Sequence, residues 1–222
     1  MSGLLPENVA RLAIDLSYLL VAFLFIMGLK AMSSPVTARR GIVVAGFGML
    51  IGTLMSFLYP GMGNFPLMLA AIAIGGGLAW WSGRIVAMTD MPQMIALYNG
   101  MGGGAAAAIA AVELYKGGEH DLVTMILAVV GGLIGAVSFS GSAIAFGKLQ
   151  GLIKRSFRFG GQQMFNLALL IGALVLGGMV ALHLNTSPAI ITGFFVVALV
   201  LGLTMTLPIG GADMPVVISL YN

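Results

Sequence analysis

The sequence contains no cysteine and very few charged residues. Charged side chains make up 8% of the 222 residues and hydrophobic side chains 59%, whereas a soluble domain carries about a quarter charged residues. Without cysteine the chain can form no disulfide, no thiolate nucleophile and no cysteine-ligated metal site. The shortage of charge, with a mean hydropathy of +1.07, indicates an integral membrane protein, and the net charge of +3 gives no indication of nucleic-acid binding.

Motifs for nucleotides, metals and hydrolysis are also missing from the sequence. None of the 33 glycines belongs to a Gly-x-Gly-x-x-Gly pattern after a strand-like run or to a P-loop, and no metal-ligand cluster or Ser/His/Asp set suits catalysis. Small residues instead let membrane helices approach closely, so we interpret most glycines as packing positions. We therefore expect no metal, no bound cofactor and no catalytic group that acts alone in this chain.

Seven apolar runs follow one another along the chain, each about twenty residues long, the length that crosses a bilayer as a helix. They cover residues 9–29, 41–59, 66–88, 92–116, 122–146, 164–184 and 189–207. An eighth run begins near Met214 and stops at Asn222, too short to cross. We predict an all-α, polytopic transmembrane helix bundle with at least seven spans plus the start of an eighth. Residues 1–222 would form a single transmembrane domain of a longer, truncated protein.

The connections between these spans differ in charge. The first, third and fifth carry basic residues, among them Arg84 in the third, whereas the second and sixth carry no charge. Cytoplasmic connections of membrane proteins are enriched in lysine and arginine. We therefore expect the odd-numbered connections to be cytoplasmic and the amino terminus to lie outside.

Ten residues occur twice in nearly the same form. Residues 90–99 read DMPQMIALYN and residues 213–222 read DMPVVISLYN. Each copy has an aspartate, then a proline at an expected first helical turn, and an asparagine two turns inside an apolar segment. An amide in hydrocarbon is costly unless it is paired. Duplication alone accounts for two copies of a helix start, but not for the retention of the buried amide.

Asn99, Ser142 and Asn222 are expected at one level below the cytoplasmic surface. Asn99 lies about 10 Å into its helix at 1.5 Å per residue, and Asn222 lies at the same depth in the second copy. Ser142 precedes Lys148 by six residues on a helix that runs the other way. Three helices would thus supply one polar layer. Because serine in a membrane helix often bonds its own i−4 carbonyl, a purely structural role for Ser142 stays open.

Two carboxylates are further candidates for a proton path. Glu113 shares a helix face with Asn99, about 21 Å away, across a seam of small residues at 103–110. Asp15 lies about 9 Å inside the first span, where an ionisable residue is a functional candidate by default. The structural alternative is that Glu113 is an interfacial carboxylate beside Lys116 and that the seam only packs helices.

Three segments carry specific motifs, in order, along nearly the whole chain. Residues 89–104 read TDMPQMIALYNGMGGG, residues 139–149 read FSGSAIAFGKL, and residues 210–217 read GGADMPVV. These segments resemble the membrane domain of the beta subunit of proton-translocating nicotinamide nucleotide transhydrogenase. The resemblance implies a complex that passes hydride from NADH to NADP⁺ and couples this reaction to proton movement.

The resemblance also implies partners and residue roles. NAD(H) would bind to a domain of an alpha subunit and NADP(H) to a domain after the last beta helix, in a homodimeric assembly of the bacterial inner (plasma) membrane, surrounded by lipid. This chain alone would have no catalytic redox site. By position, Ser142 and Asn222 match the proton path and Asp213 matches the loop that communicates with the NADP(H) domain. We assign Arg84 and Asp90 to the same coupling.

One position departs from the family pattern. Many members have histidine where this chain has Asn99, and an asparagine does not titrate. We therefore hypothesise that a titratable group, a histidine by preference, comes from a membrane helix of the alpha subunit that packs against the 103–110 seam. Two other functions stay open at this point: a secondary transporter or channel for a small solute, and a structural anchor for soluble domains.

Overall fold

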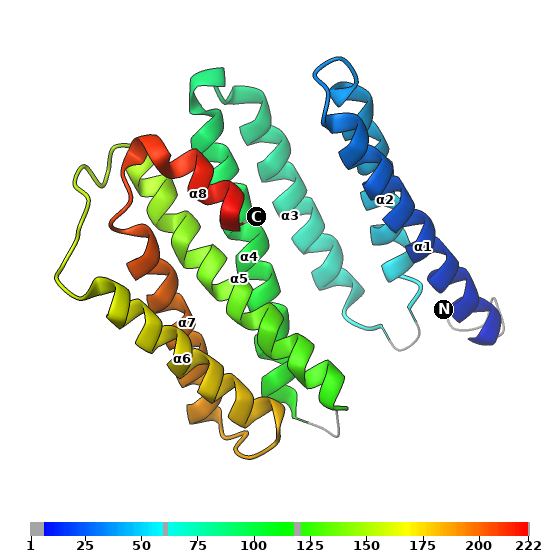
Figure 1. The fold of residues 1–222 in the computed structure, drawn as a ribbon. Helices are drawn as coiled ribbons and strands as arrows, with labels where there is room; N and C mark the ends of the chain where they lie inside the picture. Colours follow the sequence, from blue (N-terminus) through cyan, green and yellow to red (C-terminus); the bar gives the residue numbers. More distant parts are fainter. Residues whose placement is uncertain (1–6, 60–61, 118–120, 222) are drawn as a thin grey trace. The chain divides into compact units, whose positions relative to one another are not determined.

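The computed structural model describes residues 7–59, 62–117 and 121–221, and every regular element in these ranges is a helix (Figure 1). The long helices are α1 (Glu7–Met32), α2 (Ala38–Ser56), α3 (Phe65–Ile85), α4 (Met91–Lys116), α5 (Leu122–Leu149), α6 (Gln162–Ala181) and α7 (Pro188–Thr206). A shorter helix, α8 (Met214–Tyr221), follows them. Two short 3₁₀ helices, η1 (Met88–Asp90) and η2 (Gly211–Asp213), directly precede α4 and α8.

The predicted set of membrane spans is confirmed. In the described part of the chain, seven helices are long and apolar enough to cross a membrane, and they correspond one to one with the seven predicted runs. The bounds differ by a few residues. For example, α6 ends at Ala181 rather than at 184, because His183 adopts a left-handed conformation (φ 53°). The amides of Leu184 and Asn185 then donate to the carbonyl of Met179, which closes the helix end.

The chain divides into two compact units, which are described separately. In the first unit, residues 1–84, α1 and α2 pack side by side through glycines. A Cβ atom on Gly41 would lie 2.6 Å from the carbonyl oxygen of Gly28, so the two backbones touch where a side chain would hold them apart. α3 buries none of its residues.

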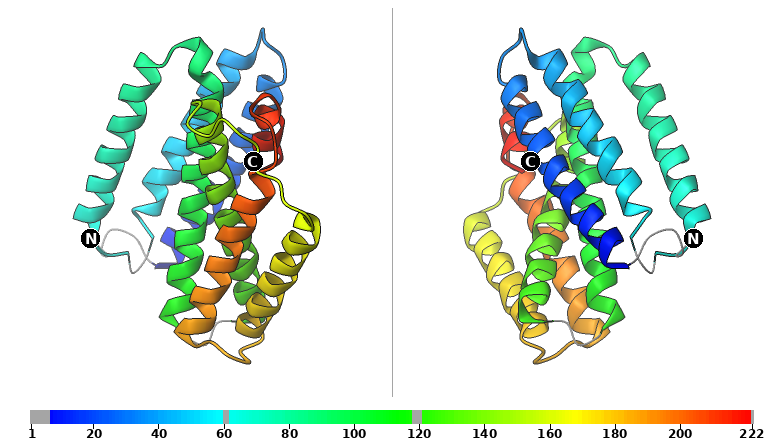
Figure 2. Two further views of the ribbon diagram at one scale, coloured as in Figure 1. Left: turned by 90° about the vertical axis from the view of Figure 1, so that its left-hand side faces the viewer. Right: turned by 90° about the vertical axis from the view of Figure 1, so that its right-hand side faces the viewer.

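The second unit, residues 85–222, is built around α5. This helix contacts α4, α6, α7 and α8, and it lies between α4 on one side and α6 and α7 on the other (Figures 1 and 2). Its contact with α4 is again backbone to backbone. A Cβ atom on Gly135 would lie 2.6 Å from the amide nitrogen of Ala107 and 2.6 Å from the carbonyl oxygen of Gly103.

Two apolar clusters form the core of this second unit. One lies where α5 and α7 begin, around the fully buried Phe194 and Val180. The other lies where α4 and α8 begin and α5 ends, and it joins Ala96, Ala145, Met214 and Ile218. Along α4 and α5, the residues between these clusters carry the polar side chains described next.

Candidate functional site

The first copy of the repeat folds as its sequence predicts. Asp90 ends η1, α4 begins at the next residue, and Pro92 lies in the first turn, where its missing N–H removes no helical hydrogen bond. Asp90 is exposed and accepts a long hydrogen bond of 3.5 Å from Nε2 of Gln93. The helix therefore starts at a fixed residue, and this start sets the depth of Asn99.

Asn99 contacts two serines of α5. Its Nδ2 donates to Oγ of Ser142 at 3.0 Å and to Oγ of Ser138 at 3.3 Å. Both serines are buried, with 1% and 5% of their surface exposed, and Asn99 is half-buried. The close approach depends on Gly100, where a Cβ atom would lie 3.1 Å from Cβ of Ser142. The structure thus brings together two of the three residues expected in one polar layer and adds Ser138 as a third.

The second copy of the repeat begins in the same way. Asp213 ends η2 and α8 begins at Met214, just as Asp90 ends η1 and α4 begins at the following residue. Asp213 is exposed, whereas Met214 is fully buried. Asn222, the third member of the expected layer, lies outside the described residues.

Lys148 has a role that the sequence argument missed. It is 8% exposed, and its ammonium donates to the backbone carbonyls of Thr206 (3.3 Å), Leu207 and Ile209 (2.5 Å). These carbonyls use all three donors of the ammonium, so the buried charge is satisfied. Lys148 thereby ties the end of α5, one and a half turns beyond Ser142, to the segment that leads into η2 and Asp213.

The other candidate residues are more scattered. Glu113 is half-buried on α4, next to the buried Leu114. Asp15 is exposed on α1. The guanidinium of Arg84 lies 4.4 Å from the centre of the Trp80 ring at the end of α3. Asp15 and Arg84 belong to the first unit, whereas the Asn99 cluster belongs to the second.

Part of the small-residue seam at 103–110 packs against α5 of the same chain. Gly103 approaches Gly135, and a Cβ atom on Gly132 would lie 3.2 Å from Cβ of Ala110. The close neighbour of Gly103 and Ala110 in this chain is α5, and the packing of a partner helix against the rest of the seam stays a prediction. Sequence periodicity identified a packing face but could not identify the helix that occupies it.

A groove of about 570 Å³ runs beside this seam, between α4 and α5. Its walls are Ile95, Tyr98, Asn99, Gly102, Gly103 and Ala106 from α4, and Gly131, Ile134, Gly135 and Ser138 from α5. None of these residues has a carboxylate or an imidazole. The described ranges contain no group of three or more His, Asp or Glu side chains that could hold a metal ion. The cluster can therefore hydrogen-bond and hold water, but the groove offers no carboxylate or imidazole to carry a proton.

These features define a class of protein: a polytopic membrane subunit in which two adjacent helices share an amide and two hydroxyls inside an apolar bundle. Comparison with known proteins makes this more specific. The family model described as NAD(P) transhydrogenase beta subunit matches residues 14–222. The chain belongs to this family.

Two curated relatives named NAD(P) transhydrogenase subunit beta, from Rhodospirillum rubrum and from strain ATCC 11170 of that species, agree with this assignment. Each is 36% identical over 218 residues, covering 93% of this chain and 46% of the relative. The chain therefore spans about half the length of the curated relatives it matches. The resemblance inferred from the three motif segments is confirmed.

Proposed function

We propose that this chain is the proton-conducting membrane part of a proton-translocating NAD(P) transhydrogenase. In that enzyme, soluble domains would pass hydride from NADH to NADP⁺, and NAD(H) and NADP(H) would bind to those domains rather than to this chain. The observation that carries the proposal is the pair of partly buried hydrogen bonds from the Asn99 amide to Ser142 and Ser138, within the helix bundle of a transhydrogenase beta subunit.

The chemistry of the cluster suits a relay for protons rather than a proton store. Hydroxyl groups donate and accept hydrogen bonds, and an amide does both through separate atoms, so the cluster can orient water without changing its charge. The titratable group is proposed to come from a membrane helix of the alpha subunit. The groove between α4 and α5 exposes Asn99 to such a helix beside small residues, Gly102 and Ala106.

Coupling to the nucleotide domains is proposed to pass through the cytoplasmic ends of the helices. Asp213 is exposed immediately before α8, and Asp90 occupies the equivalent place before α4. Residues 147–163, and separately Arg84 of the first unit, are further proposed contacts of the nucleotide domain. Lys148 connects α5 to the segment before Asp213. A domain that binds differently in its two redox states would then shift the Asn99 cluster, and proton occupancy would in turn shift the domain.

The complete assembly is proposed to be a homodimer with alpha subunits in the bacterial inner membrane. Glu113 and Asp15 are kept as candidates for the outer part of the path, and Asn222 as the third member of the polar layer. A solute transporter is less well supported, because α1 to α7 each run unbroken within the described ranges, whereas many transporters interrupt helices at mid-membrane.

The test is to reconstitute the complete enzyme in liposomes and to measure hydride transfer and internal pH together. Ser142→Ala should slow proton-coupled turnover about tenfold or more, because it removes the hydroxyl that accepts from Nδ2 of Asn99 at 3.0 Å. A tenfold loss of rate corresponds to about 1.4 kcal/mol. Ser140→Ala is the matched control, since Ser140 is equally buried on α5 but bonds the carbonyl of Ala136 in its own helix. Its turnover should stay near the unchanged protein's value.

Two results would contradict this proposal. One is an equal loss of turnover in Ser142→Ala and Ser140→Ala with an equal loss of thermal stability, which would mean that the serines only pack. The other is a structure of the whole assembly in which no ionisable side chain approaches Asn99 or Ser142. Asn222→Asp, expected to impair coupling more than stability, extends the test to the third position.

A further inference from the structure

A second groove lies on the other side of α5. α5 and α6 touch at Gly177, where a Cβ atom would lie 2.5 Å from Cγ1 of Val129, and they diverge toward the start of α6 (Figures 1 and 2). The space that opens between them has a volume of about 520 Å³, within the range of about 300–1,000 Å³ of small-molecule sites. We call it the α5–α6 groove.

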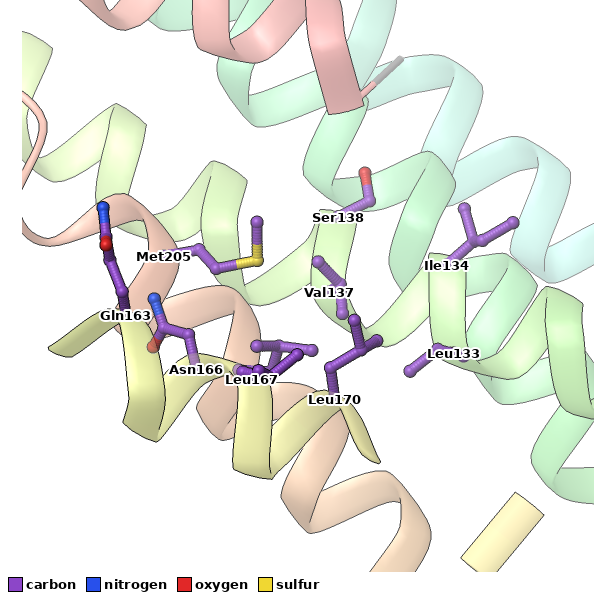
Figure 3. Close-up of a pocket in the computed structure, with 10 residues that line it drawn as sticks. Leu133, Ile134, Val137, Ser138, Gln163, Asn166, Leu167, Leu170 and Met205 are labelled. Carbon is purple, nitrogen blue, oxygen red and sulfur yellow. The ribbon is translucent and has the colours of Figure 1, made fainter. Parts of the chain in front are cut away.

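The lining of the α5–α6 groove is apolar except at one end. Ten residues line it: Leu133, Ile134, Val137, Ser138, Gln163, Asn166, Leu167, Leu170, Leu201 and Met205. The amides of Gln163 and Asn166 lie together near Met205, away from Leu133 (Figure 3). Oδ1 of Asn166 is buried and has no hydrogen-bond partner within the described part of the chain. A buried polar atom without a hydrogen bond is energetically costly. The amide end of the groove therefore lacks a hydrogen-bond donor for Oδ1 of Asn166.

Positive charge accumulates next to the same end. The sequence has no aspartate or glutamate between Asp121 and Asp213, yet the connection from α5 to α6 carries Lys154, Arg155 and Arg158. All three are exposed. No carboxylate in this stretch of sequence balances them, and they are exposed, whereas the ammonium of Lys148 is buried among backbone carbonyls.

Backbone contacts hold this cationic connection beside the groove. Nε of Arg158 donates to the carbonyl of Pro208 at 3.2 Å, three residues beyond Met205 in the groove wall. Nε2 of Gln162 donates to the carbonyl of Thr204 at 2.8 Å. The rest of the Arg158 guanidinium keeps donors for a ligand, and a guanidinium binds phosphate oxygens in pairs.

We propose that the α5–α6 groove binds one anionic phospholipid. Its phosphate contacts Arg158 and the neighbouring cations, its glycerol and headgroup oxygens meet the amides of Gln163 and Asn166, and one acyl chain lies along Leu167 and Leu170. A single phospholipid supplies negative charge, polar oxygens and hydrocarbon in the order in which the protein presents cations, amides and leucines. This inference does not depend on the proposed proton path.

The test uses the complete assembly, purified in mild detergent and equilibrated with vesicles of phosphatidylglycerol or of phosphatidylcholine. Native mass spectrometry then counts the lipids that each assembly retains. The unchanged protein should retain phosphatidylglycerol about tenfold (about 1.4 kcal/mol) more strongly than phosphatidylcholine. Both lipids have a phosphate, but the choline ammonium cancels the negative charge of phosphatidylcholine and is repelled by the exposed cations. Equal retention of the two lipids would overturn the proposal.

Two variants, each with a matched control, separate the contribution of the groove to lipid retention from the contribution of the positive charge. Leu170→Trp places a bulky ring in the apolar part of the groove and should reduce retention of both lipids, whereas Ile171→Trp, an exposed position on the same helix outside the groove, should leave retention unchanged. Arg158→Gln, at an exposed site, should remove only the preference for phosphatidylglycerol, whereas Arg39→Gln in the first unit should not.

Three outcomes would contradict the lipid site. They are unchanged retention in Leu170→Trp, an equal loss in Ile171→Trp, and a helix of a partner subunit seated in the groove in a structure of the assembly. Arg158→Gln also keeps the proposal testable should Leu170→Trp fail to assemble, because its exposed side chain takes part in no apolar core.

Discussion

The two copies of the repeated decapeptide start helices in the same way but bury different faces. In the first copy Met91 and Ile95 are 49% and 51% exposed and Ala96 is fully buried. In the second copy Met214 and Ile218, the equivalent positions, are 0% and 2% exposed, and Ser219, the equivalent of Ala96, is exposed. The repeat therefore specifies a backbone, and the neighbouring helices decide which side of it is buried.

The two buried faces meet one another. Ala96 of the first copy shares one apolar cluster with Met214 and Ile218 of the second, and Ala145 of α5 completes it. If both copies buried the same face, they could not pack in this way. The two copies of the duplicated sequence thus form the two sides of one apolar contact.

The largest effect should come from replacing by alanine the isoleucine that occupies the same position in each copy. Ile218→Ala should lower the free energy of unfolding by about 2–5 kcal/mol, the usual cost of a cavity at a buried isoleucine. Ile95→Ala should change it by less than about 0.5 kcal/mol. Unfolding of the purified chain in mixed detergent micelles measures both. Equal losses would mean that the copies are packed alike.

A smaller effect should distinguish the hydrogen bonds that connect each copy to α5. Lys148→Met leaves three carbonyls before the second copy without their donor and should cost about 1–3 kcal/mol. Gln93→Leu removes a hydrogen bond of only 3.5 Å from the first copy to the carbonyl of Leu149 and should cost less than about 0.5 kcal/mol. The same unfolding assay applies. Lys154→Met, at an exposed cation of the neighbouring connection, serves as control and should behave like Gln93→Leu.

The smallest effect concerns a third aspartate that precedes a helix, Asp121 before α5. The hydroxyl of Thr124 donates to Oδ1 of Asp121 at 2.5 Å, and this hydrogen bond lowers the pKa of that carboxyl below its usual 3.8. A carboxyl with a lowered pKa stabilises the fold above pH 3.8, and this contribution is lost as the pH falls through the lowered value. Thr124→Ala should return the pKa toward 3.8, measurable by NMR titration. No change in the pKa would contradict the assigned cause.

Much of the fold follows from the sequence because the bilayer constrains it strongly. Apolar length identified the seven spans, and the Asp-x-Pro pattern identified both helix starts. Counting forward from the first helix start for Asn99, and back from Lys148 for Ser142, placed both at one depth, and the structure joins them by a hydrogen bond. Ser138 was visible on the same face as Ser142, but only the coordinates give it the amide as a partner.

The parts that the sequence could not predict depend on contacts between distant segments. Lys148 has the pattern of a loop cation that orients the chain, because its acceptors lie at residues 206–209, outside any motif. The seam at 103–110 has the pattern of a helix contact, but periodicity does not say which helix is the neighbour. The space of about 520 Å³ between α5 and α6 depends on an angle between two helices, which composition does not encode.

The backbone contact between α4 and α5 also limits how the Asn99 cluster can respond to a signal. At Gly103 and Gly135 the two main chains touch without a side chain between them, so no rotamer change there can absorb a displacement. A displacement at either end of α5 must then slide the whole helix or tilt it about its glycine contact with α4. A displacement at the Lys148 end of α5 would therefore move Ser138 and Ser142 relative to the amide of Asn99.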